Sequence, residues 1–294
     1  VTLFVVLAVI FVVVLEFDSI FSDDKTKEET YPQEKLETIE EGNLKVHYLD
    51  VGQGDAIFVE LPSKETILID AGNKSNGEGI VEYIKSKGYD TLNFVIATHP
   101  HADHIGGMEE VIRNLKIDKF YMPKKSHTTK TFENMLAALK ERQVPVSTAK
   151  SGVTIFNYDN LKGNLISPVK DNYSNLNDFS AVFKLEYLDR SFLFTGDAEK
   201  GAEEAINSEY KTDVLKVGHH GSDTSTTDKF LEKASPKYAV ISVGEDNKYN
   251  HPSDSTLKKL NDKNIEVYRT DLDGTVIFTT DGYELIIEKV ETDI

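Results

Sequence analysis

The 294-residue sequence contains no cysteine. Disulfide bonds and thiolate metal sites are therefore excluded, and any bound metal must be held by histidine, aspartate, glutamate or water. Positive charge is also scarce, because 33 lysine and arginine residues stand against 50 aspartate and glutamate residues, a formal net charge of −17. An acidic surface repels phosphate backbones, so we expect no stable binding to duplex DNA, although a local basic site is compatible with this balance.

The N-terminal segment lacks charge altogether. Residues 1–15 are uncharged and almost entirely apolar, and Phe17, Ile20 and Phe21 extend this pattern, interrupted by Glu16 and Asp18. Fifteen residues are fewer than the roughly 20 that span a bilayer as a helix, and the segment has neither a basic flank nor an evident small-residue cleavage site. We interpret residues 1–21 as a membrane anchor, with a signal segment as the second interpretation and a buried core helix as the third.

The composition changes sharply after this segment. Residues 22–43 are rich in charged side chains, poor in apolar ones, and contain Pro32. This composition predicts a charged flexible linker, with an exposed helix as the alternative. The folded domain is then expected over residues 44–294, on the outer side of the membrane. Its strands come first and then alternate with helical patterns, in two strand-rich halves (44–150 and 151–290), which predicts a layered α/β domain.

One short loop concentrates metal-binding side chains. His99, His101, Asp103 and His104 fall within six residues, directly after the apolar strand expected over residues 92–97. The carboxyl end of such a strand is where open α/β folds bind ligands. His99 and His101 are two residues apart and point to the same side of an extended segment, so they can hold one cation together. Asp103 and His104 follow a bend and can face a second cation. The ligand types suit zinc, or manganese or iron; an ordinary polar loop is the alternative.

The remaining histidines divide into two groups. His47 lies within an expected strand and is predicted to be structural, whereas His127 lies in a lysine-rich polar loop and is expected at the surface. The other candidates follow expected strands directly: Asp197, His219, His220 and His251. Scattered structural histidines would not sort in this way, so we expect one shared site at one edge of the sheets, with Asp197 able to bridge two cations.

These segments resemble the metallo-β-lactamase superfamily. The loop THPHADHIGG carries the resemblance to the whole superfamily, and the runs LDVGQGDA, LFTGDAE and GHHGS are more similar to its ComEC-type competence branch and to related phosphodiesterases, including phosphorylcholine esterases of cell-wall teichoic acid. The resemblance implies an αββα sandwich in which two mixed β-sheets are flanked by helices. It also implies two divalent metal ions, with zinc first and manganese as the alternative.

The resemblance assigns roles to individual positions. The implied metal ligands are His99, His101, Asp103, His104, Asp197 and His220. Asp103 would also orient the nucleophile, and His219 would face the substrate as a catalytic residue. His251 and Ser222 would contact a phosphate oxygen or the leaving group, and Asp70 would brace the metal loop. Many superfamily members carry a further ligand histidine before the bridging aspartate; here no histidine lies between His127 and Asp197, so water would complete one coordination sphere.

The implied activity is metal-dependent hydrolysis, in which the cations activate a water molecule. We expect a phosphodiesterase or nuclease-like enzyme that acts on a nucleic-acid strand or a cell-wall phosphoester. A lactam, lactone or thioester hydrolase is the enzymatic alternative. A membrane-anchored binding module without catalytic activity is the other.

Overall fold

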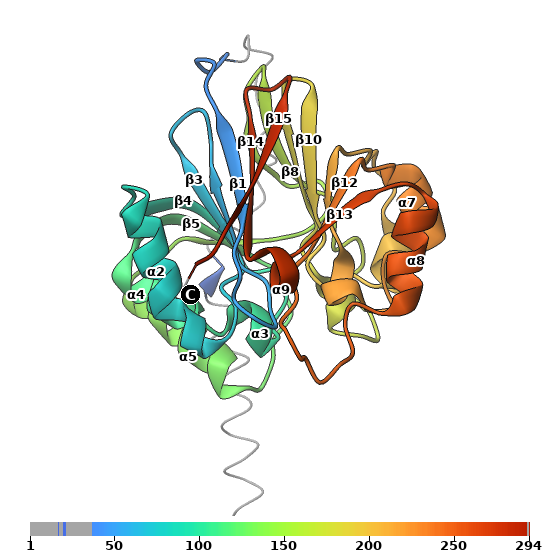
Figure 1. Cartoon of the computed structure of the whole chain (residues 1–294). Helices are drawn as coiled ribbons and strands as arrows, with labels where there is room; N and C mark the ends of the chain where they lie inside the picture. Colours follow the sequence, from blue (N-terminus) through green and yellow to red (C-terminus); the bar gives the residue numbers. More distant parts are fainter. Residues whose placement is uncertain (1–16, 18–19, 22–36, 293) are drawn as a thin grey trace, which may run out of the picture.

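The computed structural model describes residues 17, 20–21, 37–292 and 294. The predicted membrane segment (1–21) and the predicted linker (22–43) lie largely outside these residues. The described residues form two mixed β-sheets that face each other, with helices on the outer side of each sheet (Figure 1). This arrangement confirms the predicted α/β class and the αββα sandwich.

The first sheet has eight strands in the order β15-β14-β1-β2-β3-β4-β5-β6. They are β1 (Leu44–Tyr48), β2 (Ile57–Glu60), β3 (Thr66–Ile69), β4 (Thr91–Ile96), β5 (Lys116–Met122), β6 (Val146–Thr148), β14 (Thr275–Thr280) and β15 (Leu285–Val290). The strands from β15 to β3 are antiparallel, and those from β3 to β6 are parallel. The two predicted strand-rich halves (44–150 and 151–290) do not correspond one to one to the two sheets. Strands β14 and β15 complete the first sheet, because β14 pairs with β1.

The second sheet has seven strands in the order β13-β12-β11-β10-β9-β8-β7. They are β7 (Thr154–Asn157), β8 (Leu161–Leu165), β9 (Phe183–Tyr187), β10 (Arg190–Phe194), β11 (Val214–Lys216), β12 (Tyr238–Ile241) and β13 (Glu266–Arg269). Strands β10 to β13 run parallel to one another. Their carboxyl ends, like those of β3 to β5, therefore meet at one edge of the sandwich, where parallel sheets place binding sites.

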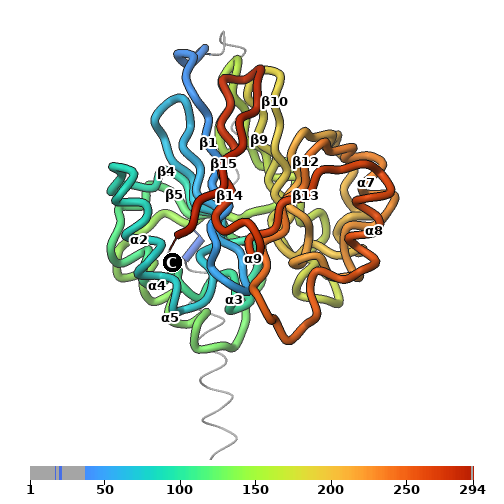
Figure 2. Tube along the Cα trace, viewed as in Figure 1, coloured from blue at the N-terminus to red at the C-terminus, as the bar shows by residue number. Residues whose placement is uncertain are grey.

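The helices are α2 (Gly77–Ser86), α3 (Ala102–Ile105), α4 (Met108–Asn114), α5 (Lys130–Glu141), α6 (Lys200–Ala205), α7 (Asp228–Ala234), α8 (Asp254–Asp262) and α9 (Thr270–Asp273). Helices α2, α4 and α5 cover the first sheet, and α7 and α8 cover the second (Figure 2). Three of them begin at hydroxyl N-caps (Thr129, Thr227 and Ser253), whose side-chain oxygens accept backbone N–H groups of the first turn. None of the described helices has the length and apolar character needed to cross a bilayer.

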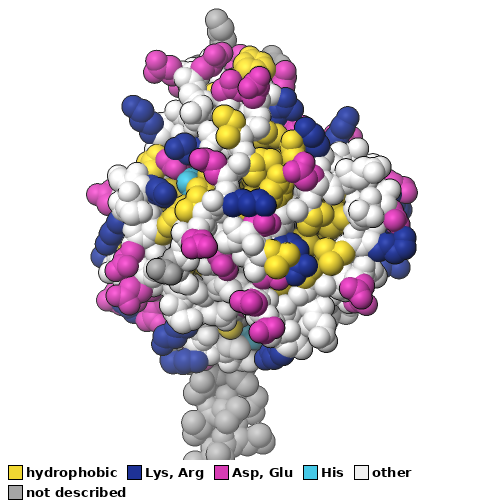
Figure 3. Space-filling model, viewed as in Figure 1, with side chains coloured by type: hydrophobic (Ala, Val, Ile, Leu, Met, Phe, Trp, Pro, Cys, Tyr) yellow, Lys and Arg dark blue, Asp and Glu magenta, His cyan; other side chains and the backbone are white. Residues whose placement is uncertain are grey.

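Acidic side chains outnumber basic ones, but charged side chains are spread over the visible surface of the molecule. Side chains of both signs are interspersed on the face shown in Figure 3, and apolar side chains gather in its middle, near β14 and β15. The exposed Ile286 and Val290 belong to β15. The net negative charge is therefore not confined to one patch of this face.

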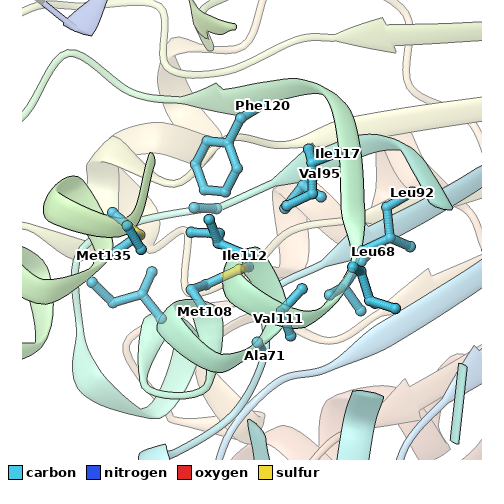
Figure 4. Packing of buried hydrophobic residues seen from close by; sticks show 14 of the residues in the cluster. Leu68, Ala71, Leu92, Val95, Met108, Val111, Ile112, Ile117, Phe120 and Met135 are labelled. Carbon is cyan, nitrogen blue, oxygen red and sulfur yellow. The ribbon is translucent and has the colours of Figure 1, made fainter. Parts of the chain in front are cut away.

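Three clusters of buried apolar side chains hold the layers together. In the first cluster, Met108, Val111 and Ile112 of α4 pack toward the first sheet, which contributes Val95 and Phe120 (Figure 4). The second cluster lies between the two sheets and is rich in aromatic rings, and the third lies beneath α7 and α8. Because helices and strands on both sides contribute, the metal loop between β4 and α4 is attached to a fully packed scaffold.

Residues upstream of the first strand also contact this scaffold. Phe17 is buried in the first cluster, with its ring centroid 5.7 Å from that of Phe132 on α5, and Phe21 forms a β-bridge with Val146. Ile39 donates its backbone N–H to Asn160. The described residues on either side of residues 22–36 therefore lie against the domain.

We expect the substitution Phe120→Ala to destabilise the fold strongly. Phe120 is fully buried between β5 and the helices, and truncating such a ring costs about 3–5 kcal/mol through lost burial and the cavity left behind. Urea unfolding monitored by circular dichroism measures the change in the free energy of unfolding. Ile286→Ala on the exposed edge strand is the control and should change it by less than about 0.5 kcal/mol; similar losses for both variants would contradict the packing described.

Candidate metal centre

The candidate ligands meet at the edge of the sandwich where the parallel strands end. The loop after β4 carries His99 and leads through His101 into α3, which lies at this edge in Figure 1. Asp197 follows β10, and His219 and His220 follow β11. Three segments distant in sequence thus deliver their side chains to one place, as expected when carboxyl strand ends from two sheets face each other.

Two sets of side chains converge on one carboxylate. Within each set the potential ligand atoms lie within 4.8 Å of one another, and the sets are His99, His101 and Asp197, and Asp103, His104 and His220. The Nε2 atoms of His104 and His220 lie 3.2 and 3.6 Å from Asp197 Oδ1. The Nε2 atom of His99 lies 3.7 Å from the other oxygen, Asp197 Oδ2. Asp197 therefore lies between the two sets with one oxygen toward each.

The unpaired atoms of this centre fit a metal ion. His104 Nε2, His220 Nε2 and Asp197 Oδ1 are all buried and have no hydrogen-bond partner. Buried polar atoms are normally paired, because an unpaired one costs about 1–3 kcal/mol. Coordination of a divalent cation would satisfy all three atoms, and the mixture of imidazole and carboxylate suits zinc, manganese or iron.

Asp70 anchors the metal loop from the end of β3. Its carboxylate accepts hydrogen bonds from the Thr98 backbone N–H (2.8 Å) and hydroxyl (2.6 Å), and it lies 2.8 Å from His104 Nδ1. A carboxylate on Nδ1 fixes the ring so that Nε2 faces the centre. Asp70 has φ 57°, in the left-handed region that non-glycine residues rarely adopt. The surrounding contacts hold it there, as sites with a demanding geometry often do.

The neighbouring histidines of the GHHG turn point in different directions. His219 and His220 adopt consecutive left-handed conformations, with φ 46° and 51°, between Gly218 and Gly221. His220 is buried, and its Nδ1 lies 2.8 Å from the Ser242 carbonyl oxygen, which leaves Nε2 toward the ligands. His219 belongs to neither ligand set and lines the cleft instead.

Glu199, which sequence reasoning leaves without a role, holds His219 in place. Glu199 Oε1 lies 2.9 Å from His219 Nδ1 and accepts hydrogen bonds from Asn177 and Thr224. The Nε2 atom of His219 is thereby directed into the cleft, 3.7 Å from Asp197 Oδ2. The signal available in the sequence is only a carboxylate two residues after Asp197, which alone does not distinguish this role from a solvated helix start.

A buried ion pair beneath the centre was also not predicted. Lys216, fully buried at the end of β11, lies 2.6 Å from Asp55 Oδ2, and Asp55 Oδ1 lies 3.3 Å from His220 Nδ1. Burial alone raises the pKa of Asp55, but the charges of Lys216 and His104 outweigh burial and hold that pKa below its usual value. A lysine at the end of an apolar strand, separated from GHHG only by Val217, is the signal that could have indicated this pair.

The loop that carries Asp55 also supports the ligands through its backbone. The Asp55 N–H donates to the Asp103 carbonyl oxygen at 3.1 Å. At Gly54 (φ 154°) an added Cβ atom would lie 2.4 Å from the same oxygen. Only glycine permits this close approach, so the LDVGQGDA segment is part of the scaffold of the metal loop.

The electrostatic field of the centre favours cations. Burial lowers the pKa of His220, but the charge of Asp197 and the nearby carboxylates of Asp103 and Asp55 outweigh burial and raise it to about 9. The pKa of His104 is also raised well above its usual value, since Asp197 and Asp70 outweigh its burial. A field that stabilises positive charge on these rings would equally attract a divalent cation. Burial, followed by the charge of His104, holds the pKa of His99 well below its usual value, so His99 is neutral and ready to coordinate.

An open cleft of about 410 Å³ leads to the centre. Its lining residues are Gln53, His101, Ala102, Asp103, His127, Thr129, Asp197, His219, His220, Tyr249 and His251. His251, predicted to face the substrate, lies in this cleft with its ring 5.4 Å from that of His219. His127, predicted to lie at the surface, is partly exposed and lines this open cleft, with its ring 6.1 Å from that of His101.

Ser222 does not reach the cleft. It is buried, and its hydroxyl lies 2.9 Å from the Thr224 hydroxyl and accepts the Thr224 backbone N–H. The expected contact with a phosphate oxygen is therefore replaced by a local role in closing the loop after Gly221. The pattern GHHGS places Ser222 next to the site in sequence, but the backbone turns its side chain inward.

A layered αββα sandwich with a shared histidine and carboxylate centre at one sheet edge defines the class of metallo-hydrolases. The sequence profile of the metallo-beta-lactamase superfamily matches residues 49–245. The chain belongs to this superfamily, whose members bind divalent metals at such centres.

Curated relatives narrow the resemblance. The chain is 34% identical to ComE operon protein 3 of Bacillus subtilis over 251 residues, covering 79% of the chain and 32% of that protein. It is 27% identical to Competence protein ComA of Neisseria gonorrhoeae over 247 residues, covering 82% of the chain and 33% of that protein. The chain thus spans about a third of the length of these relatives, and the predicted resemblance to ComEC-type competence proteins is confirmed.

A solved structure shows the same fold. The metallo-beta-lactamase fold protein YhfI from Bacillus subtilis aligns with a TM-score of 0.54 and 10% sequence identity, covering 81% of the chain and 100% of YhfI. At this identity the likeness concerns the architecture alone.

We expect Asp197→Ala to lower the metal content of the purified protein by at least half. Its carboxylate faces both ligand sets, so its removal weakens both sites. Inductively coupled plasma mass spectrometry of protein refolded with zinc measures the metal bound per chain. His127→Ala, which changes a cleft histidine outside both sets, is the matched control and should retain the metal; equal loss in the two variants would contradict the assignment.

We expect Lys216→Met to destabilise the fold by about 3–5 kcal/mol, because it leaves the buried Asp55 carboxylate without its cation. The double variant Asp55→Asn with Lys216→Met removes both charges and should recover a large part of this loss. Urea unfolding of the wild type and the two variants gives the three free energies. A double variant no more stable than Lys216→Met would show that the pair does not act through charge compensation.

Proposed function

We propose that this chain is a metal-dependent phosphodiesterase with two divalent cations, zinc first and manganese as the alternative. The observation that carries the proposal is the pair of ligand sets that share Asp197 at the floor of an open cleft. The similarity to competence proteins supports a phosphodiester substrate, with a nucleic-acid strand first and a cell-wall phosphoester second. The net charge of −17 argues against stable binding to duplex DNA.

The ligand sets divide the work of holding the cations. One cation would be held by His99 and His101. The other would be held by Asp103, His104 and His220, and Asp197 would contact both cations. A divalent cation held in this way supplies Lewis acidity: it makes water more acidic and offsets negative charge that develops on phosphoryl oxygens. Asp70, Thr98 and the Ser242 carbonyl keep the imidazole rings oriented for this purpose.

Asp103 is suited to orient the attacking water. It lines the cleft and is partly exposed. Burial alone raises the pKa of this carboxyl group, but the charge of His104 and the adjacent His220 ring outweigh burial and hold that pKa well below its usual value. Asp103 is therefore ionised and can only accept hydrogen bonds, so it would accept one from the attacking water and fix its direction.

His219 is suited to the opposite side of the reaction. Glu199 Oε1 accepts a hydrogen bond from His219 Nδ1–H, and His219 Nε2 faces the cleft. From there His219 would donate a hydrogen bond to a phosphoryl oxygen or a proton to the departing oxygen, which is the usual contribution of a positioned imidazole. His251, with its ring beside that of His219, would support the same end of the substrate.

We also propose that residues 1–21 attach the chain to a membrane and that the domain lies outside. The apolar composition of residues 1–15 and the competence relatives support attachment. Phe17, Ile20 and Phe21 pack against the domain, so the attached segment would leave the domain close to the membrane surface.

The activity is tested with a panel of substrates on zinc- or manganese-loaded protein. We expect hydrolysis of bis(p-nitrophenyl) phosphate and of a single-stranded oligonucleotide, loss of both activities after EDTA treatment, and recovery when metal is restored. Asp103→Asn should lower kcat by about a hundredfold, the scale of a lost positioned base. Hydrolysis of nitrocefin or a lactone without any phosphodiester would instead establish the alternative enzyme, and no turnover by the loaded protein would indicate a binding module.

A further inference from the structure

One exposed aromatic ring lies at the mouth of the cleft. Among the described residues, Tyr249 and Tyr283 are the exposed aromatic residues, at 52% and 49%, and of these only Tyr249 lines the cleft. Its ring contacts are with His251, at 5.7 Å and an interplanar angle of 24°, and with Lys248, whose Nζ lies 5.1 Å from the ring centroid. Tyr249 is therefore not part of the hydrophobic core, and its exposure needs another explanation.

The loop that carries Tyr249 is held firmly in place. Asn247 Oδ1 accepts the backbone N–H groups of Tyr249 and His251 at 3.2 and 3.0 Å, and Asn247 Nδ2 donates to the carbonyl oxygens of Gly244 and His251. The Gly244 N–H in turn donates to the side chain of Gln53, which also lines the cleft. A loop fixed in this way presents the ring without help from the core.

The rings form a row that leads from solvent to the metal centre. Tyr249 lies beside His251, His251 lies 5.4 Å from His219, and His219 Nε2 lies 3.7 Å from Asp197 Oδ2. A substrate whose phosphate reaches the centre would thus have its adjoining group beside Tyr249. An exposed aromatic face at this place suits a flat, apolar partner, and nucleobases stack on such rings whatever their sequence.

The charge beside the ring favours a base over a quaternary ammonium group. Aromatic rings bind choline-like cations through their negative faces. Here Lys248 already places a cation near the ring, and a second cation would be repelled. The same lysine attracts the phosphates on either side of a stacked base.

We propose that Tyr249 is a specificity-determining residue that stacks on a nucleobase next to the scissile phosphate, so that the substrate is a single-stranded nucleic acid. A base inside a duplex has both faces covered and cannot stack in this way. This inference rests on the proposed phosphodiesterase function, since it assumes that the phosphate lies at the metal centre.

Binding and hydrolysis are tested separately on the full chain. A fluorescein-labelled hexathymidylate and an abasic hexamer of the same charge, built from tetrahydrofuran phosphates, are compared with zinc bound. Slowly hydrolysed phosphorothioate forms are used for fluorescence anisotropy, and the phosphate forms are used for turnover. We expect Tyr249→Ala to raise Kd and KM for hexathymidylate at least about fivefold, as expected for one lost base–aromatic stack. The abasic hexamer should bind and react equally with the wild type and the variant.

The control variants separate stacking from other effects. Tyr249→Phe keeps the ring and should behave as the wild type, and Tyr283→Ala removes an exposed ring away from the cleft and should change nothing. Equal effects of Tyr249→Ala on both hexamers, or a rise in KM for p-nitrophenylphosphorylcholine instead, would overturn the inference. If wild-type protein binds hexathymidylate through Tyr249 but hydrolyses no phosphodiester, the proposed activity fails while the stacking role stands.

Discussion

The structure around the site depends on four carboxylates that lie close together at one edge of the sandwich. Asp55, Asp70, Asp103 and Asp197 lie within the same small region, and three of them are almost completely buried. Such a concentration of negative charge is tolerable only if each carboxylate has a positive or donating partner. Lys216, the histidine rings and the Thr98 hydroxyl provide these partners, and the atoms left over are those directed at the metal positions.

This requirement explains why so much of the scaffold converges on the site. The glycine at position 54 lets one loop approach another, and the left-handed turn at His219 and His220 sends one ring inward and the other toward the cleft. Each of these backbone features brings a charged or hydrogen-bond-donating group close to its partner in the site. The helices and the three apolar clusters contribute rigidity, because a site built from loops keeps its geometry only when the strand ends beneath them are fixed.

Much of this arrangement could be predicted from the sequence, because its signals are local. The spacing of His99 and His101, and the position of each candidate ligand directly after an apolar strand, follow from the geometry of single strands. The partners that sequence reasoning did not find are those set by contacts between distant segments. Lys216 and Asp55 lie 161 positions apart in the numbering, and the local sequence around Lys216 hints at a buried charge without identifying Asp55 as its partner. The predicted substrate contact of Ser222 was wrong for a related reason. The backbone conformation of its turn, and not its place in the motif, decides where its side chain points.

The pairing of β14 with β1 has a consequence for how the chain acquires its shape. Leu44 lies opposite Thr280 in this ladder, so the first sheet stays incomplete during synthesis until almost the whole described sequence has left the ribosome. Until then β1 presents an open edge, and closing a loop of this length makes late assembly slow. The first sheet is therefore completed late, when β14 and β15 arrive after its other strands have been synthesised.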